Sequence, residues 1–351
     1  MSAERLAILV TGGTGSFGRK FIASALKNLN PSAVRVYSRD ELKQHDMQRD
    51  PSFQDERLRF LIGDVRDQSR LQRAMEGVDL VVHAAALKQV PVCEYNPFEA
   101  VKTNVLGAQN VIESALNLEV PRVIAVSTDK AVNPVNLYGA TKLCAEKMFT
   151  AANAYVGSKN IRISCVRYGN VVGSRGSVVP LFLAQRHTGR ITITDKRMTR
   201  FWITLEQAVD FVSGCIGRMR GGEIFVPKIP STMLLDLAAV AAPNAEIRVT
   251  GIRPGEKIHE VLLTEDEARV AREYDTYFVI EPKYPGSGER QYVGGASLPD
   301  GFRYASDTNP SRLSREQLCK MVAEIEADLG LASLGSHAVP FVAAGPVVER
   351  T

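Results

Sequence analysis

The residues best suited to chemistry in this chain are Tyr138 and Lys142, four positions apart, and the acid–base pair Asp129-Lys130, which begins nine residues before the tyrosine. All four lie in the segment VSTDKAVNPVNLYGATK. On a helix, positions i and i+4 share one face, so the tyrosine and the lysine can meet the same ligand. An ammonium close to a phenol favours the phenolate and lowers the tyrosine pKa. We therefore expect Tyr138 to act as a base towards a hydroxyl group.

The N-terminal region carries the pattern of a dinucleotide site. The apolar residues 6–10 predict a buried strand, and Gly12, Gly15 and Gly18 follow at a spacing of three. A helical pattern comes next, so strand, glycine turn and helix stand in the order that a dinucleotide fingerprint requires. The glycines let the backbone approach a pyrophosphate, and the helix N-terminus supplies amide donors. Together with Tyr138 and Lys142, this motif predicts a nicotinamide cofactor that takes a hydride.

The composition narrows the class of protein. The 351 residues carry a formal net charge of +4, and the positive residues are scattered, which argues against nucleic acid as a partner. Five cysteines without a CxxC pair predict reduced thiols and a cytoplasmic protein. We expect neither a signal peptide nor a membrane span, because MSAER leads directly into a strand and no apolar run is long enough. His83 and His259 have no second histidine at ligand spacing, so we expect structural histidines and no metal site.

Apolar runs alternate with helical patterns, which predicts an α/β fold with a doubly wound parallel sheet of the Rossmann type. The predicted strands are residues 6–10, 34–37, 58–62, 80–83, 122–127 and 161–167. In such sheets the ligand lies beyond the carboxyl ends of the strands. Five small or polar residues fall at those ends, namely Gly12, Ser38, Asp64, Ala84 and Ser127. We therefore expect one large cleft at this edge of the sheet.

The sequence pattern changes after about residue 170. We predict that residues 1–170 form the dinucleotide-binding domain, to which a segment at about 195–225 returns, and that residues 171–335 form mainly a smaller substrate-binding lobe. Glycine, proline and tyrosine are frequent in residues 283–299, which is typical of irregular loops. Ser314 and Gln317 have the spacing of a capping box and predict a helix over 314–329. Residues 336–351 are expected to form a tail.

Seven segments carry a resemblance to a known family. They are TGGTGSFG, YSRDELKQ, GDVRD, HAAALKQVPVCEYNPFEAVKTNVLG, STDKAVNPVNLYGATK, RYGNVVGSRGSV and RPGEKIHE. Over about residues 5–330 the chain resembles the extended short-chain dehydrogenases/reductases that act on nucleotide sugars. Within that group it closely resembles the UDP-N-acetylglucosamine 4,6-dehydratases that invert C5 and begin pseudaminic acid biosynthesis. STDKAVNP, AALKQVP and RPGEKIHE are more specific than the glycine motif or YxxxK.

The resemblance implies a role for each residue around the tyrosine. Tyr138 takes the proton of the C4 hydroxyl as hydride leaves C4, Lys142 lowers its pKa and holds the cofactor ribose, and Thr128 hydrogen-bonds the same hydroxyl. Oxidation at C4 acidifies the C5 proton, because the carbanion is delocalised into the ketone. Lys130 is then the base at C5 and Asp129 the acid at O6, which requires pKa values shifted towards neutrality. Retaining relatives typically have Asp-Glu at these positions.

Cofactor choice depends on the end of the second strand. Arg39 and Lys43 favour NADP over NAD, because an arginine at this place accommodates the 2′-phosphate, although Asp40 lies between them. The resemblance implies that Asp64 and Val65 contact adenine. The complete set of expected cofactor-binding residues is Gly12, Thr14, Gly15, Ser16, Phe17, Gly18, Ser38, Arg39, Lys43, Asp64, Val65, Ala84, Ala85, Ala86, Asn104, Ser127, Tyr138 and Lys142.

The resemblance implies UDP-N-acetylglucosamine as the substrate. Lys88 is expected to line the sugar site and Asn170 to hold the pyrophosphate. Arg200, Arg253 and Glu256 are candidates for diphosphate and ribose contacts, since the guanidinium fork donates two parallel hydrogen bonds to phosphate. A surface ion pair is the alternative for each of them. The resemblance also implies a homo-oligomer, from dimer to hexamer, assembled through helices next to the active site.

The sequence also leaves three alternative functions. A nucleotide-sugar C4 epimerase and a retaining 4,6-dehydratase share the fold, and Asp129-Lys130 argues against both. A non-catalytic NADP-binding sensor would not need Tyr138 and Lys142. Asp129 and Lys130 could also form a loop salt bridge without a catalytic role.

Overall fold

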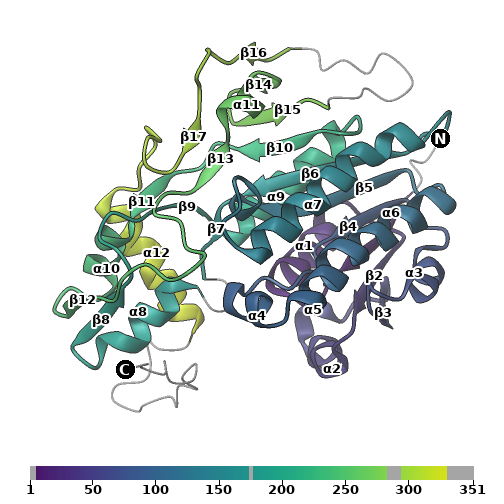
Figure 1. Cartoon of the computed structure of the whole chain (residues 1–351). Coiled ribbons are helices and arrows are strands. Elements are labelled where there is room, and N and C mark those ends of the chain that lie inside the picture. Colours follow the sequence, from purple (N-terminus) through teal and green to yellow (C-terminus); the bar gives the residue numbers. More distant parts are fainter. Residues whose placement is uncertain (1–4, 174–176, 283–293, 330–351) are drawn as a thin grey trace.

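Six parallel strands form the centre of the molecule, in the order β3-β2-β1-β4-β5-β6 (Figure 1). The computed structural model describes residues 5–173, 177–282 and 294–329. The six strands are β1 (Ala7–Thr11), β2 (Ala33–Ser38), β3 (Leu58–Ile62), β4 (Leu80–His83), β5 (Arg122–Thr128) and β6 (Arg162–Tyr168). This order is that of a Rossmann sheet, so the predicted fold class is confirmed, and each predicted strand ends within one residue of the observed one.

The later chain extends this sheet. β10 (Ile224–Pro227) pairs in parallel with β6, and β15 (Tyr277–Ile280) then pairs with β10 in the antiparallel direction. β14 (Ala271–Glu273) and β16 (Ala296–Ser297) complete ten strands. The later chain therefore contributes strands to the sheet from beyond the predicted segment at 195–225. The division into domains stays a prediction.

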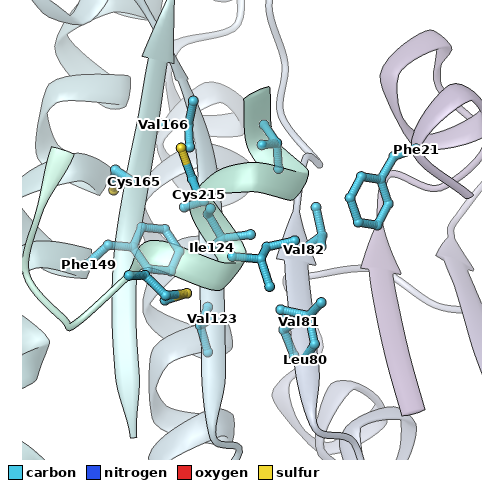
Figure 2. Packing of buried hydrophobic residues seen from close by; sticks show 14 of the residues in the cluster. Phe21, Leu80, Val81, Val82, Val123, Ile124, Phe149, Cys165, Val166 and Cys215 are labelled. Atoms are coloured by element: carbon cyan, nitrogen blue, oxygen red, sulfur yellow. The ribbon is translucent and has the colours of Figure 1, made fainter. Parts of the chain in front are cut away.

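Helices cover both faces of the sheet, which explains why the central strands are apolar along their whole length. α1 (Ser16–Asn28) packs beside α9 (Leu205–Arg218), while α3 (Gln68–Met75), α6 (Gly107–Asn117) and α7 (Leu137–Ala151) form a second row (Figure 1). Phe149 of α7 and Cys215 of α9 are fully or almost fully buried against β4, β5 and β6 (Figure 2). None of the five cysteines, all of which are described, is paired.

A second, smaller core lies beyond the carboxyl ends of the parallel strands. It is built from three helices, α8 (Val178–Arg186), α10 (Leu234–Ala241) and α12 (Arg315–Asp328). Two small sheets accompany them, β11 (Ser231–Met233)-β9 (Thr199–Ile203)-β7 (Asn170–Val171) and β12 (Glu246–Val249)-β8 (Arg190–Ile193). Ser314 caps α12 and Gln317 completes a capping box, as predicted. Because β7 follows β6 directly, the second core stands next to the expected ligand edge.

The remaining elements are short and connect these layers. They are α2 (Glu41–Arg49), η1 (Pro51–Phe53), α4 (Val90–Tyr95), α5 (Pro97–Val101), η2 (Lys102–Leu106), η3 (Asp129–Ala131), η4 (Ala152–Tyr155), β13 (Val261–Leu263), α11 (Glu265–Ala268) and β17 (Tyr304–Ala305). No helix in the described part of the chain is long and apolar enough to cross a membrane. The predicted tail at 336–351 and residues 283–293 of the predicted loop lie outside the described residues.

A buried ion-pair network joins the central sheet to the later chain. Arg167 on β6 is completely buried and contacts Glu146 of α7 at 2.7 Å and Glu267 of α11 at 2.9 Å. Its guanidinium also donates to the carbonyl of Leu262. Two carboxylates and a carbonyl thus satisfy one buried guanidinium, as a buried charge requires. This network fixes α7, which carries Tyr138, to β13 and to α11, which follows it.

Candidate active site

The glycine turn after β1 leaves a helix N-terminus open to an anion. Gly12 has φ +67°, and a β-carbon there would come within 2.9 Å of the amide nitrogen of Ala85. A β-carbon at Gly18 would lie 2.6 Å from the carbonyl oxygen of Gly12. Gly15 gives α1 no side-chain cap, and the first turn, which begins at Ser16, has no acidic residue. Its amides are therefore available to a pyrophosphate.

Two side chains brace this turn. Thr14 is hydrogen-bonded to Ser38 at the end of β2, with 2.8 Å between the hydroxyl oxygens. Phe17 lies 6.5 Å from the ring of Tyr168 at the end of β6. The glycine turn is thus tied to the ends of β2 and β6, and the sequence predicted ligand contact at the first of these, Ser38.

Some of the charged residues after β2 form ion pairs and hydrogen bonds within α2, and others are exposed to solvent. Asp40 caps α2 by accepting a hydrogen bond from the backbone of Lys43, and its carboxylate pairs with the Lys43 ammonium. Arg39 is 54% exposed and lies 3.9 Å from Asp64, whose carboxylate is held mainly by Arg66 at 2.7 Å. Asp40 is therefore occupied in α2, whereas among the described residues the Arg39 guanidinium has only the distant Asp64 as an ion-pair partner.

The loop after β4 is held by a buried asparagine. Asn104 accepts a hydrogen bond from the amide of Leu87 and donates one to the carbonyl of the same residue, at 2.8 and 2.9 Å. It lies in η2, a π-helical turn, a form that is frequent at functional sites. Its amide positions the backbone at 84–87, and Val65 is buried nearby under α6. Direct contact of either residue with a cofactor stays a prediction.

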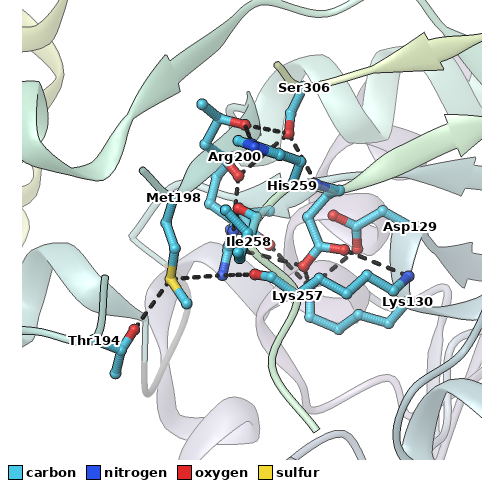
Figure 3. Close-up of polar contacts among 12 residues, drawn as sticks. Asp129, Lys130, Thr194, Met198, Arg200, Lys257, Ile258, His259 and Ser306 are labelled. Atoms are coloured by element: carbon cyan, nitrogen blue, oxygen red, sulfur yellow. Dashed lines mark hydrogen bonds and ion pairs between the residues drawn. The ribbon is translucent and has the colours of Figure 1, made fainter. Parts of the chain in front are cut away.

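The acid–base pair lies where β5 ends. The ammonium of Lys130 donates to Oδ1 of Asp129 at 3.0 Å (Figure 3). It also donates to the side-chain oxygen of Asn170 at 3.1 Å. The hydroxyl of Thr128 donates to the same Oδ1 at 2.8 Å. Asp129 is 0% exposed, and within the described residues its Oδ2 has no hydrogen-bond partner. The hydroxyl of Ser127, one step earlier on β5, is likewise buried and without a partner in the described chain.

The tyrosine and the lysine lie on α7, as predicted, but their pKa values differ from the expectation. Burial raises the pKa of Tyr138 to about 12, against the opposing effects of Lys130 and of a hydrogen bond with Thr128. Lys142 donates to the carbonyl of Val126 at 2.8 Å, and burial lowers its own pKa. In the protein alone the pKa of Tyr138 is therefore raised and not lowered as expected, and the cation that most opposes the effect of burial is Lys130.

Lys130 also departs from the expected shift towards neutrality. Burial alone lowers its pKa, but the nearby carboxylates of Asp129 and Glu260 outweigh burial, and the net shift is upward. The Glu260 carboxylate lies 3.6 Å from the Lys130 ammonium. Lys130 is consequently held as a cation in the protein, because two carboxylates stabilise its charge.

Gly139, the residue after the tyrosine, was not singled out from the sequence. A β-carbon at this position would overlap the carbonyl oxygen of Lys130, so the glycine lets η3 pack directly against α7. Asn136 caps α7 by accepting from the Gly139 amide at 2.7 Å and donates to the carbonyl of Gly255 at 2.8 Å. The only sequence signal for this contact is a glycine inside a helical pattern, which is unfavourable unless packing requires it.

The residues predicted to bind the substrate differ from one another in burial and in hydrogen-bond partners. Asn170 joins the acid–base pair, as described. Arg200 is almost buried, and its guanidinium donates to the carbonyls of Thr199, Lys257 and Ile258 at 2.7–3.0 Å (Figure 3). It therefore supports the backbone of the RPGEKIHE segment. In that segment Glu256 accepts from the backbone of Arg253, which is exposed.

Lys88 is exposed in the loop after β4. Substrate contact by Lys88, Arg253 and Glu256 stays a prediction.

The two histidines have structural partners. The Nδ1 of His83 lies 2.8 Å from the hydroxyl of Thr11, and burial, with a contribution from Lys142, lowers the pKa of His83 to about 3. His259 is hydrogen-bonded to Thr199. No group of histidine, cysteine, aspartate and glutamate side chains in the described ranges could hold a metal ion.

Comparison with known proteins gives close relatives. A family model described as "Polysaccharide biosynthesis protein" matches residues 8–282. The UDP-N-acetylglucosamine 4,6-dehydratase (inverting) of Campylobacter jejuni subsp. jejuni serotype O:23/36 (strain 81-176) is 49% identical over 332 residues, 91% of this chain and 98% of the relative. The UDP-glucose 4-epimerase of Rickettsia akari (strain Hartford) is 41% identical over 336 residues, 91% of this chain and 96% of the relative.

Solved structures agree with the fold. The X-ray structure of Pen from Bacillus thuringiensis superimposes with a TM-score of 0.84 at 38% identity, covering 93% of this chain and 99% of that chain. The crystal structure of DesIV, a dTDP-glucose 4,6-dehydratase from Streptomyces venezuelae with NAD and TYD bound, gives a TM-score of 0.67 at 21% identity over 93% and 98% of the two chains. At 21% identity, the similarity to DesIV shows only that the two chains share a fold.

We predict that Gly139→Ala impairs turnover while the protein still folds. The added methyl group must displace η3 from α7, and a misplacement of about 1 Å can cost roughly 100-fold in rate. Steady-state kinetics together with thermal unfolding measure both effects. Gly217→Ala on α9 is the matched control, because a β-carbon there meets nothing within 4 Å. Turnover of Gly139→Ala equal to that of the control would show that the close contact is unimportant.

Proposed function

The chain belongs to the polysaccharide biosynthesis protein family, and we propose that it is a UDP-N-acetylglucosamine 4,6-dehydratase that inverts C5. The observation that carries the proposal is the Asp129-Lys130 pair beside Tyr138, because it supplies one acid and one base next to the tyrosine that would take the C4 hydroxyl proton. The 49% identity to the inverting dehydratase supports the same assignment. A cytoplasmic, homo-oligomeric enzyme remains our prediction from the sequence.

The residues present fit a nicotinamide dinucleotide, and we propose that it is NADP. The open amides at the start of α1 suit the pyrophosphate, and Gly12 lets the backbone approach it closely. Arg39 is available for the 2′-phosphate, since the competing acid Asp40 is occupied in α2. When bound, the nicotinamide would accept a hydride from C4 and return it to C6.

Oxidation at C4 requires the phenol of Tyr138 to act as a base. Its pKa of about 12 in the protein alone means that the phenol keeps its proton until the site is loaded. The positive charge of Lys130 already opposes this effect of burial, and a cationic nicotinamide would add to it. Thr128 links Tyr138 to Asp129 by hydrogen bonds, so the residues for oxidation and for elimination form one connected group.

Elimination follows from a proton transfer within the ion pair. A proton moves along the 3.0 Å hydrogen bond from the Lys130 ammonium to Asp129, which gives a neutral amine and a carboxylic acid. The amine then takes the C5 proton, and the acid gives its proton to the C6 hydroxyl, which leaves as water. Asp129 ends as a carboxylate and Lys130 as an ammonium, so the pair is restored. Protonation at C5 and hydride return to C6 complete the 4-keto-6-deoxy product.

The strongest alternative is a C4 epimerase, because the Rickettsia relative bears that name at 41% identity. An epimerase oxidises and reduces C4 and has no leaving group at C6, so it needs no acid–base pair for elimination. A retaining dehydratase would protonate C5 on the original face. A non-catalytic sensor would bind the dinucleotide without turnover. Product analysis separates the four.

The proposed function predicts a specific product in deuterated water. Purified enzyme with UDP-N-acetylglucosamine and no added oxidant should form the 4-keto-6-deoxy sugar with inverted C5, and deuterium should appear at C5. Nuclear magnetic resonance of the product measures both features. UDP-N-acetylgalactosamine would instead indicate the epimerase, retained C5 configuration the retaining dehydratase, and no turnover the sensor.

Cofactor choice gives a separate prediction. Arg39→Ala should weaken binding of NADP more than that of NAD, because only NADP carries the phosphate that the guanidinium would contact. The affinity ratio should shrink by about tenfold or more, the effect of losing one charge-assisted hydrogen bond. Titration calorimetry with both cofactors measures it. Arg49→Ala, which removes a positive charge at the other end of α2, is the control, and an unchanged ratio in Arg39→Ala would remove the residue from the site.

A further inference from the structure

Glu260 is a buried acid next to the proposed catalytic pair. It ends the RPGEKIHE segment, directly before β13, and its side chain is 4% exposed. Its backbone is fixed on both sides by Ser306, whose hydroxyl accepts from the Glu260 amide at 2.9 Å and whose amide donates to the Glu260 carbonyl at 2.8 Å. The carboxylate is thus placed by a rigid part of the fold.

Three cations surround this carboxylate, and none makes a close hydrogen bond with it. The ammonium of Lys130 lies at 3.6 Å, the guanidinium of Arg200 at 3.8 Å and the ammonium of Lys257 at 3.7 Å (Figure 3). Within the described residues the Oε2 of Glu260 has no hydrogen-bond partner. At these distances the carboxylate acts on its neighbours mainly through its charge.

Lys130 stands between two carboxylates from different parts of the chain. Asp129 comes from η3 and Glu260 from the segment before β13, while Tyr138 of α7 and Arg200 of β9 also face the lysine. Of the two carboxylates, only Asp129 is hydrogen-bonded to the lysine, so Asp129 can exchange a proton with it. Glu260 is too distant for direct exchange and stabilises the ammonium by charge alone.

We propose that Glu260 is a positioning residue that keeps Lys130 as an ammonium against Asp129 and so controls how readily the lysine becomes the base for elimination. This inference rests on the proposed function for its place in the reaction. Lys257 has the opposite effect on the protonation of Lys130, because its positive charge lies next to the same carboxylate and partly offsets the negative charge there. Its ammonium also donates to the carbonyl of Val132, just after η3, so it lies within the same cluster.

The direction of the effect follows from the charges. Asp129 and Glu260 together raise the pKa of Lys130 against burial, so removing the Glu260 charge lowers that pKa and increases the neutral fraction at any given pH. Removing the positive charge of Lys257 leaves the negative charge of Glu260 less compensated. This raises the pKa of Lys130 and decreases the neutral fraction of Lys130. A loss of stability would not produce opposite shifts in the two variants.

The test measures the protonation of Lys130 directly. Folded protein is acylated with acetic anhydride at fixed pH values between about 8 and 10, where a tenfold change in rate reports one pKa unit. Mass spectrometry of the peptide gives the rate at Lys130, whose side chain is 26% exposed. Glu260→Gln should react at least about tenfold faster than the unaltered protein. Lys257→Met should be acylated at Lys130 more slowly than the unaltered protein. In a pH–rate profile of turnover, the loss of activity at high pH should come at a higher pH for Lys257→Met than for Glu260→Gln.

Glu223→Gln is the matched control for burying a neutral amide in place of a carboxylate. Glu223 is also buried, bonded to Ser164 at 2.6 Å, and it lies at the start of β10, outside the proposed site. This variant should lose stability and leave Lys130 acylation unchanged. Equal or slower acylation in Glu260→Gln, or faster acylation in Lys257→Met, would overturn the proposal. Acylation needs no turnover, so this result is independent of whether the protein dehydrates UDP-N-acetylglucosamine.

Discussion

The ion pair between Asp129 and Lys130 is the interaction on which the site depends. Asp129 is fully buried, and a buried carboxylate is tolerated only with a cation and hydrogen bonds to compensate its charge. Lys130 and Thr128 provide these on one oxygen, and within the described residues the other oxygen has no partner. The same 3.0 Å hydrogen bond that stabilises the buried charge is the path by which one proton can prepare both an acid and a base.

Two distant parts of the chain hold this pair in place. From α7, Gly139 allows the turn of Lys130 to approach the helix that carries Tyr138. From the later chain, Glu260 faces Lys130 while Arg200 supports the backbone around it. Asn136 joins the two parts by capping α7 and bonding Gly255. The proposed catalytic group is therefore complete only when the RPGEKIHE segment packs beside the start of α7 and Lys130.

Local patterns in the sequence were sufficient for the fold and for the residues on single elements. The six parallel strands, the helix bearing Tyr138 and Lys142 and the capping box at Ser314 all follow from periodicity and short motifs. Glu260 could not be found in this way, because it reaches Lys130 across 130 positions of sequence. The pKa directions were wrong for the same reason, since helical spacing indicated Lys142 as the partner of Tyr138, whereas burial and Lys130 dominate in three dimensions. The short strand β10 is equally ambiguous from sequence, because a four-residue apolar run fits either a strand or a buried helix.

The central claim is that Lys130 removes the C5 proton after Tyr138 has taken the C4 hydroxyl proton. The most direct measurement follows Lys130→Ala with UDP-N-acetylglucosamine and NADP in deuterated water. Absorbance should report reduced cofactor, because oxidation at C4 does not need the lysine, while nuclear magnetic resonance should find almost no deuterium at C5 and almost no 4-keto-6-deoxy product. Exchange at C5 at the rate of the unaltered enzyme would contradict the account and assign the base to another residue.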